Sequence, residues 1–318
     1  MITAHGSQAS FLMGCEENCP SWGGIMIWDV KTDPETPKYL GKFECPGGQG
    51  VHRSFYSGGR YAYITGCDEG FASFFLRIID LQDPTNPVEA GHFYVPEQIE
   101  KDADDVKFGD HLFHPFVHAV TVKDDIAYLA YSNVGFVMVD VHDKSNPKMI
   151  SKLPINPVFG GDAGGAPVHT AYPLGDRPFA IVSTEGERSR YFDGIKENGF
   201  GKKKVEYQAM NTILMVETGV VKQPRVIAVF PYPEVPEGYT HGTNFNFVDS
   251  VRVPFGPHNL FDAFGVDVYQ KLDQKVLCCY FHAGLRIFDV SDPFVPKEVA
   301  YFLPPDPEKC CLTIKNTI

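Results

Sequence analysis

One short unit recurs along the chain and limits its possible folds more than any other feature. The unit is an alternating apolar run that ends in an acid, then a turn that usually contains Pro, then a second short apolar run. A period of two indicates strands, and Pro suits the turn because its φ is fixed and it has no N–H to offer a strand ladder. The five copies occupy residues 25–43, 76–93, 136–153, 212–230 and 285–302.

Two further strands are predicted upstream of each strand pair, as in HRSFYSGGRYAYITG from His52. Four strands per repeat and five repeats predict an all-β, five-bladed β-propeller that forms a single domain over residues 1–318. The fourth copy departs from the pattern because it has Glu217 in place of Asp and no Asp-Pro turn. The units exceed the roughly 40–45 residues of a minimal blade. We therefore expect inserted loops at about 97–114 and 188–211.

Histidines occupy one equivalent place in four repeats, immediately before the first strand: His52, His118, His169 and His258. The first strand of a propeller blade lines the central channel, so these side chains should converge at one mouth of it. A single such histidine is read as a turn residue bonded to a carbonyl. Several neutral imidazoles aimed at one point favour a transition-metal ion. His5 precedes the first repeat in a similar way and is a fifth candidate ligand.

The loops that follow the second strands should open at the same mouth. Their polar residues are Cys15, Glu16 and Glu17, then Asp68 and Glu69, then Asn133, then Glu185 and Glu187, and finally His282. A carboxylate there can orient an imidazole, bind the ion or act as a general base, whereas a solvated loop acid is the simpler interpretation of each alone. The candidate catalytic residues are Glu185, Asp68, Glu69, His282 and Arg53. Arg53 could hold a substrate carboxylate or form an ordinary ion pair.

The composition argues against other functions and settings. The formal charge is −12, and the longest Lys/Arg cluster is 202–204, so no nucleic-acid footprint is expected. The chain has no apolar run of 18 residues and no leader pattern at its start, which predicts neither a membrane span nor a signal peptide. The eight Cys are irregularly spaced, which favours reduced thiols and a cytoplasmic location.

The repeat resembles that of the LVIVD-repeat β-propeller family, especially in LRIFDVSDPFVPKEVAYF at 285–302 and in the preceding GPHNLFDAFG. That resemblance implies the fold and no single activity. The histidine arrangement is also similar in architecture to two other kinds of propeller. In the carotenoid-cleaving oxygenases, histidines from different blades hold a non-haem iron, and the selenium-binding/methanethiol-oxidase propellers use a metal near the axis.

These observations predict a metal-dependent enzyme that acts on a small organic substrate, with a non-haem iron oxidoreductase or oxygenase as the first expectation. Fe(II) is the expected cofactor, and Zn, Mn or Cu are alternatives that the same ligands could hold. With zinc or manganese, the pocket would favour a hydrolase, lyase or isomerase. A non-catalytic interaction scaffold is the remaining alternative, but it gives no reason for the aligned histidines.

Overall fold

The structure is a computed structural model. It describes residues 1–6, 23–45, 50–71, 73–99, 106–108, 111–113, 115–132, 134–155, 168–185, 212–239, 245, 247–248, 251–252, 256–261, 272 and 274–305. Within these ranges the chain is all β apart from one 3₁₀ turn, η1 (Pro96–Gln98). No helix in the described part of the chain is long and apolar enough to cross a membrane.

Five antiparallel sheets follow one another along the chain, and we number them as blades 1 to 5. Blade 1 contains β1 (Ile2–His5), β2 (Gly24–Asp29) and β3 (Lys38–Glu44). Blade 2 contains β4 (Val51–Phe55), β5 (Tyr61–Gly66), β6 (Phe75–Asp80) and β7 (Val88–Phe93). Blade 3 contains β10 (Ala119–Lys123), β11 (Ile126–Tyr131), β12 (Gly135–Asp140) and β13 (Lys148–Leu153).

Blade 4 contains β14 (Val168–Pro173), β15 (Phe179–Thr184), β16 (Ile213–Glu217) and β17 (Arg225–Val229). Blade 5 contains β20 (Leu260–Phe261), β21 (Lys275–Cys279), β22 (Leu285–Asp289) and β23 (Lys297–Phe302). Two small hairpins lie outside the blades: β8 (Val106–Phe108) with β9 (His111–Phe113), and β18 (Phe247–Val248) with β19 (Val251–Arg252).

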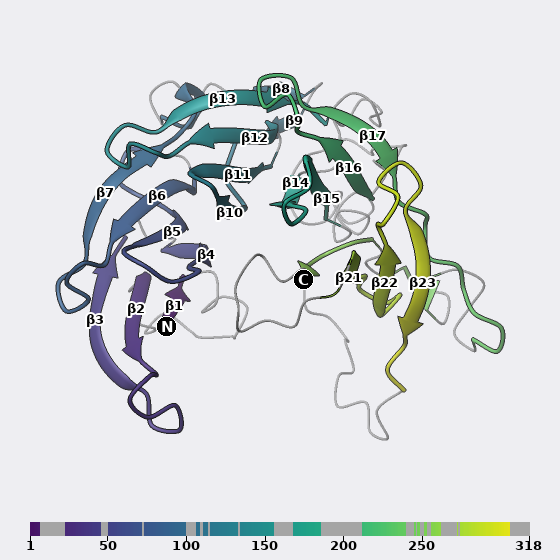
Figure 1. The fold of residues 1–318 in the computed structure, drawn as a ribbon, viewed down its shortest axis with the longest axis horizontal. Coiled ribbons are helices and arrows are strands. Elements are labelled where there is room, and N and C mark those ends of the chain that lie inside the picture. The colour runs from purple at the N-terminus through teal and green to yellow at the C-terminus, as the bar shows by residue number, and fades with distance from the viewer. Residues whose placement is uncertain are drawn as a thin grey trace.

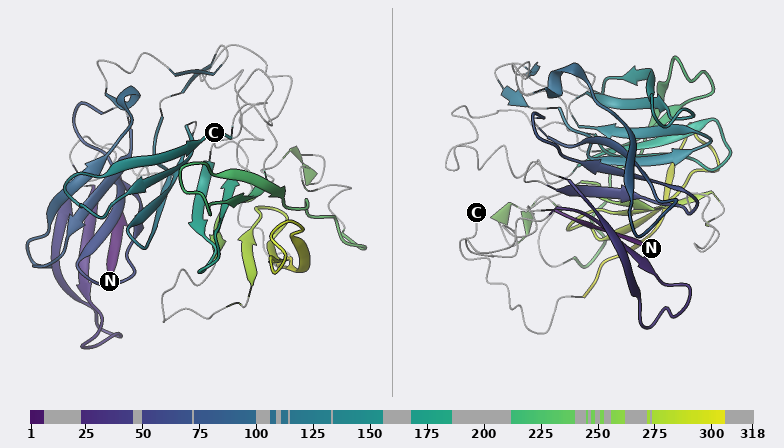
Figure 2. Two further views of the ribbon diagram at one scale, coloured as in Figure 1. Left: turned by 45° about the horizontal axis from the view of Figure 1, so that its top comes forward. Right: turned by 90° about the vertical axis from the view of Figure 1, so that its left-hand side faces the viewer.

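The blades are arranged around a common centre in chain order, which confirms the predicted five-bladed propeller (Figure 1). β4, β10 and β14 lie toward the centre, and β3, β7, β13, β17 and β23 lie at the periphery. Neighbouring sheets are stacked side by side (Figure 2). Four blades have the predicted four strands, and blade 1 has three among the described residues. The described strands form an arc that opens between blade 1 and blade 5.

The acid that marks each repeat holds the turn that follows it. Asp29, Asp80, Asp140 and Asp289 each accept a hydrogen bond through Oδ1 from the backbone N–H two residues later, at 2.8–2.9 Å. Such side-chain bonds replace backbone partners in a tight turn. In blade 4, Glu217 instead forms an ion pair with Arg225 across the hairpin, at 2.6 Å. The departure in the fourth repeat therefore changes how the turn is held and leaves the strand pair intact.

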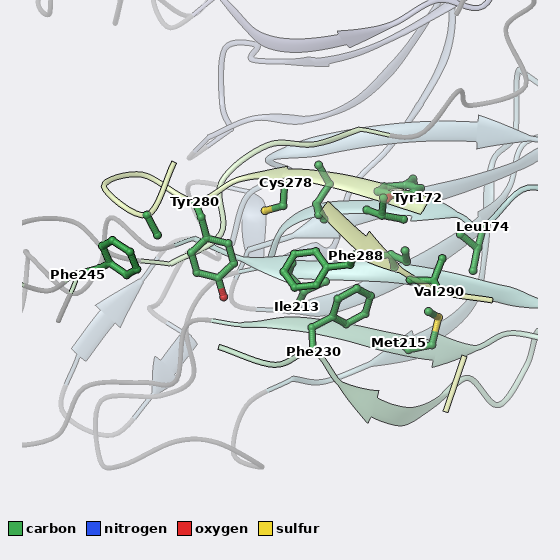
Figure 3. Close-up of a cluster of buried hydrophobic side chains, with 14 residues drawn as sticks. Tyr172, Leu174, Ile213, Met215, Phe230, Phe245, Cys278, Tyr280, Phe288 and Val290 are labelled. Carbon is green, nitrogen blue, oxygen red and sulfur yellow. The ribbon is translucent and has the colours of Figure 1, made fainter. Parts of the chain in front are cut away.

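Every buried cluster is shared by two neighbouring blades. β11 shows why: Leu129 and Tyr131 pack toward blade 2, while Tyr128 and Ala130 pack toward blade 4. The cluster between blades 4 and 5 contains Tyr172, Ile213, Met215 and Phe230 on one side and Tyr280 and Phe288 on the other (Figure 3). Burial of both faces stabilises blades 2, 3 and 4 through their two neighbours. In the part of the chain that the structure describes, packing between blades holds the channel-lining residues.

Glycines in two outer strands allow each of these blades to contact the turn of the next one closely. A Cβ at Gly91 would lie 2.1 Å from the carbonyl oxygen of Lys144, in the turn of blade 3. A Cβ at Gly41 would lie 2.5 Å from the carbonyl oxygen of Pro84, in the turn of blade 2. Only a residue without a side chain permits this approach. The repeated Gly is therefore part of the packing between blades.

The first predicted insertion begins beside the histidine end of blade 2. Gln98 Nε2 donates to the carbonyl oxygen of Phe74 at 2.8 Å, and the Tyr131 hydroxyl donates to Gln98 Oε1. The ring of Phe74 in turn stacks on that of His52, with centroids 5.5 Å apart. Residues 96–99 are therefore fixed close to the channel mouth. The second predicted insertion, 188–211, lies outside the described residues.

Candidate metal centre

A β-bulge at the start of the inner strand places each repeat histidine. In blades 2 and 4 the strand register shifts at His52 and at His169, so that each is an extra residue opposite its partner strand. In blade 3, the His118 N–H donates to the carbonyl oxygen of Ala130. Ala130 is also the strand partner of Ala119, so two residues of the inner strand lie opposite one.

The same arrangement occurs in blade 5, where the inner strand is short. The His258 N–H donates to the carbonyl oxygen of Cys279 at 2.8 Å, and the Cys279 N–H donates to that of Asn259 at 2.9 Å. A bulge interrupts the alternation of a strand and redirects a side chain, a device that is frequent next to functional sites. All four histidines thus leave the sheet at one equivalent position.

The four imidazoles form a continuous arc across blades 2 to 5. Ring centroids are 4.4 Å apart for His52 and His118, 3.9 Å for His118 and His169, and 4.5 Å for His169 and His258. His52 Nε2 and His118 Nε2 are 2.9 Å apart. The four histidines that the repeat alignment selected are therefore neighbours, but of the four only His118 and His169 belong to the group of close ligand atoms found among the described residues. Their role as metal ligands stays a prediction.

Hydrogen bonds to the other ring nitrogens set the tautomers of the two central histidines. His118 Nδ1 lies 2.9 Å from the carbonyl oxygen of His169, which can only accept, so Nδ1 carries the proton and Nε2 a lone pair. His169 Nδ1 lies 2.8 Å from Thr170 Oγ1, whose hydroxyl donates to the carbonyl oxygen of His258. His169 therefore also presents a lone pair at Nε2. That atom is buried and has no hydrogen-bond partner among the described residues.

A carboxylate lies beside these lone pairs. Ligand atoms of His118, His169 and Glu185 all lie within 4.8 Å of one another. Glu185 follows β15, and its carboxylate oxygen is 3.9 Å from His258 Nε2. His118 Nε2 faces His52 Nε2 at 2.9 Å, whereas the buried Nε2 of His169 has no partner among the described residues. A cation at this place would give that nitrogen a partner. The donor set therefore fits a first-row transition-metal ion.

Burial keeps the imidazoles neutral, the form that binds metals. Burial, together with the charges of Arg53 and His258, lowers the pKa of His52 to about 4. Burial likewise holds the pKa values of His118 and His169 well below the usual range and lowers that of His258. Ligand nitrogens of this kind do not have to lose a proton at pH 7 before a metal binds.

These shifts predict how the stability of the metal-free protein depends on pH. Histidines in the unfolded chain have a pKa of about 6.5 and take up protons first as the pH falls. The contribution of the ring to the free energy of unfolding is therefore complete above about pH 6.5 and declines toward about pH 4. At about 1.4 kcal/mol per pKa unit, we expect a loss of at least about 2 kcal/mol. Urea unfolding of metal-free protein between pH 7 and pH 4.5 measures it, and a constant stability over that range would contradict the buried neutral ring.

Arg53 crosses the channel next to the histidines. It follows His52 in β4, and its Nη2 donates to Asn259 Oδ1 at 2.9 Å, which joins blade 2 to blade 5. Burial lowers the pKa of the guanidinium, and the charge of Glu185 opposes that shift. Arg53 therefore contributes a positive charge to the same space as the imidazoles.

The structure places the other predicted site residues elsewhere or in ordinary pairs. Asp68 Oδ2 lies 3.3 Å from Nη2 of the buried Arg77 and forms an ion pair with it. Glu69 lies in an exposed turn, and His282 is exposed after β21. Five exit-loop candidates lie outside the described residues: Cys15, Glu16, Glu17, Asn133 and Glu187.

The placement of His5 corrects the alignment of the first repeat. His5 ends β1, which pairs directly with β2, and the pairing places His5 opposite Gly24. β1 is therefore the counterpart of a second strand such as β5, and the interpretation of His5 as the residue before a first strand was wrong. Its Nε2 lies 3.1 Å from Thr3 Oγ1. The pairing of β1 with β2 joins residues about twenty positions apart, and no local sequence pattern reveals it.

Three residues of the site escaped the sequence analysis. Thr170 and Asn259 directly follow ring histidines, as Arg53 does, and the bulge turns this second position toward the ring as well. Phe281 packs on His258 with centroids 4.9 Å apart and has a left-handed φ of 44°. Such a backbone is unfavourable for a bulky residue and is found mainly at functional positions. Thr170 and Asn259 could have been found from the sequence, because each directly follows a repeat histidine.

The fold and the ring together define a β-propeller with a candidate metal centre on its axis. Within it, the family model of the LVIVD repeat matches residues 57–95 and 117–153, which cover most of blades 2 and 3. The chain therefore contains LVIVD repeats, and the resemblance seen in the sequence is confirmed. No curated protein matches the chain.

Solved structures share the fold at low sequence identity. The periplasmic gluconolactonase PpgL of Pseudomonas aeruginosa is 9% identical, with a TM-score of 0.53 over 88% of this chain and 63% of that chain. The β-propeller domain of Cps50 (Swd1) of Myceliophteria thermophila is 11% identical, with a TM-score of 0.50 over 90% and 68%. The chain thus spans about two thirds of the length of these structures, and the likeness concerns the fold alone.

Proposed function

We propose that the protein is a metal-dependent enzyme whose centre lies on the propeller axis. The observation that carries this proposal is the group of acceptors formed by His118, His169 and Glu185 within 4.8 Å, with one imidazole nitrogen buried and unpartnered among the described residues. Leaving a buried acceptor unsatisfied costs free energy. An interaction scaffold has no use for such an arrangement in its channel, whereas a metal enzyme requires it.

The four repeat histidines are the proposed ligands, and Fe(II) is the proposed metal. Neutral imidazoles suit iron, zinc and copper alike. When bound, iron would activate dioxygen for reaction with a small organic substrate, which would itself supply the electrons. Thr170 holds His169 in the tautomer that offers Nε2, and His118 is held by the carbonyl of residue 169. Such outer partners fix ligand orientation.

Glu185 is the proposed proton acceptor. It ends β15 at the mouth of the channel, and its side chain is 18% exposed. It is near enough to His258 to exchange a proton through water, and near enough to the ring to reach a bound substrate. Phe74 and Phe281 pack on the two end histidines of the arc and limit the access of water to them.

A metal-assisted hydrolase, lyase or isomerase is the second candidate, and the carboxylate beside the lone pairs favours it. Such chemistry needs a general base next to an acidified water, which is the position of Glu185. A gluconolactonase is among the proteins of similar fold, at 9% identity. Zinc or manganese would take the place of iron in this version of the proposal.

Reconstitution with different metals separates the two candidates. Protein freed of metal and reloaded with Fe(II), Zn(II) or Mn(II) is offered a panel of small organic acids, esters and lactones, with an oxygen electrode and product analysis as readouts. We expect substrate-dependent oxygen uptake with Fe(II) only. Turnover without oxygen uptake, supported by zinc or manganese, would establish the hydrolytic or isomerase version instead. Absence of metal binding in all three cases would overturn the proposal.

A further inference from the structure

Arg53 is the cation that acts on the whole histidine ring. Its positive charge lowers the pKa of each of His52, His118, His169 and His258. The chain as a whole carries a formal charge of −12, so this positive spot is a local feature of the channel. A local cation within an acidic protein concentrates anions at one place.

Most N–H donors of the Arg53 guanidinium have no hydrogen-bond partner among the described residues. A guanidinium has five N–H donors, and within the described ranges that of Arg53 has one hydrogen-bond partner, Asn259. No described carboxylate lies within 4.0 Å of it, although Glu185 is close enough to stabilise its charge. A partly buried cation without a direct ion pair is only partly compensated for the water it has lost.

The surroundings of Arg53 favour recognition of a planar anion. Asn259 fixes one edge of the guanidinium from the far side of the channel, which orients the remaining N–H groups. A fixed guanidinium fork matches a carboxylate with two parallel hydrogen bonds, which a lysine ammonium cannot do. The neighbouring imidazoles are neutral and do not compete for the anion.

We propose that Arg53, oriented by Asn259, binds the carboxylate of a small carboxylic acid and thereby presents the substrate to the metal centre. This inference rests on the proposed enzymatic function and names its substrate class. In this inference Arg53 binds the substrate carboxylate and takes no part in the reaction. The bonds that are made and broken lie elsewhere in the substrate. His52 and Arg53 are adjacent residues of β4, which would keep the carboxylate and the metal at a fixed separation.

Calorimetric titration with acetate and benzoate tests this assignment, with acetamide as the neutral counterpart of acetate. Wild-type protein should bind the carboxylates and not acetamide. We expect Arg53→Gln to lower carboxylate affinity about 10- to 100-fold, because a charge-assisted hydrogen-bonded pair is lost. Arg53→Lys should recover only part of the loss. Arg225→Gln, which removes an outer-strand arginine paired with Glu217, should bind as the wild type does.

Metal content measured on the same samples separates this inference from the function on which it rests. Carboxylate affinity that falls in Arg53→Gln while metal content stays unchanged supports the assignment. The wild-type protein could instead bind carboxylates through Arg53 and bind no metal. That result would keep the assignment of Arg53 and overturn the proposed function. Equal carboxylate binding by wild type and Arg53→Gln, or no binding by either, overturns the assignment while leaving the metal centre standing.

Discussion

Replacement of His169 by Ala should reduce the metal affinity of the protein about 100-fold or more and abolish its activity. His169 is 1% exposed, its Nε2 is the buried acceptor without a described partner, and it lies between His118 and His258 in the arc. Loss of an outer partner of a ligand already lowers metal affinity about 10- to 100-fold, and loss of the ligand itself should cost more. Competition with a chelator measures the affinity.

His142→Ala is the matched control because its side chain is 84% exposed in the turn after β12, away from the ring. It should bind metal as the wild type does. Both variants should keep the circular dichroism of the wild type, since the cores lie between blades. If His169→Ala bound metal as tightly as His142→Ala, the ring would not be the metal site.

Gly91→Val should destabilise the protein by about 3 kcal/mol or more. Any Cβ at this position would lie 2.1 Å from a backbone oxygen of blade 3, and backbone cannot move aside as a side-chain tip can. The two blades would have to separate, which also opens the cluster that Leu76 and Ile78 share with Val137 and Val139. Overpacking against a rigid wall is among the few mechanisms that produce losses of this size.

Gly219→Ala provides the comparison for this prediction. A Cβ there would lie 3.5 Å from Pro178 Cβ, an ordinary contact, and the residue is exposed. We expect its free energy of unfolding to stay within about 0.5 kcal/mol of the wild-type value. Urea unfolding of both variants gives the difference. A Gly91→Val protein as stable as Gly219→Ala would show that blades 2 and 3 do not pack as the structure has them.

The fold could be predicted because the repeat combines a local signal with a global one. The acid and the Pro mark a turn that the Asp side chain holds, and the same turn recurs at the outer hairpins of blades 1, 2, 3 and 5. Blade 4 was recognisable despite Glu217, because the strands depend on burial between blades and not on the capping acid. The alternating apolar pattern predicts that one face of each strand is buried. The inner blades are buried on both faces, as blades 2 and 3 show.

The candidate site was only partly predictable, for a physical reason in each case. The histidines could be found by alignment because the bulge gives each the same place in its blade. Glu185 and Asp68 looked equivalent in sequence, and only the buried Arg77 that pairs with Asp68 distinguishes them. His5 was misassigned because strand pairing, which no local pattern reveals, makes β1 the partner of β2.

The most direct test of the account is the metal content of wild-type protein purified without an affinity tag, together with anomalous scattering from its crystals. The account predicts one first-row metal ion per chain, with nitrogens of His118 and His169 and of their neighbours His52 and His258 at about 2.0–2.3 Å from it. A protein without metal, in which His52 Nε2 and His118 Nε2 remain hydrogen-bonded to each other across an empty channel, would contradict it.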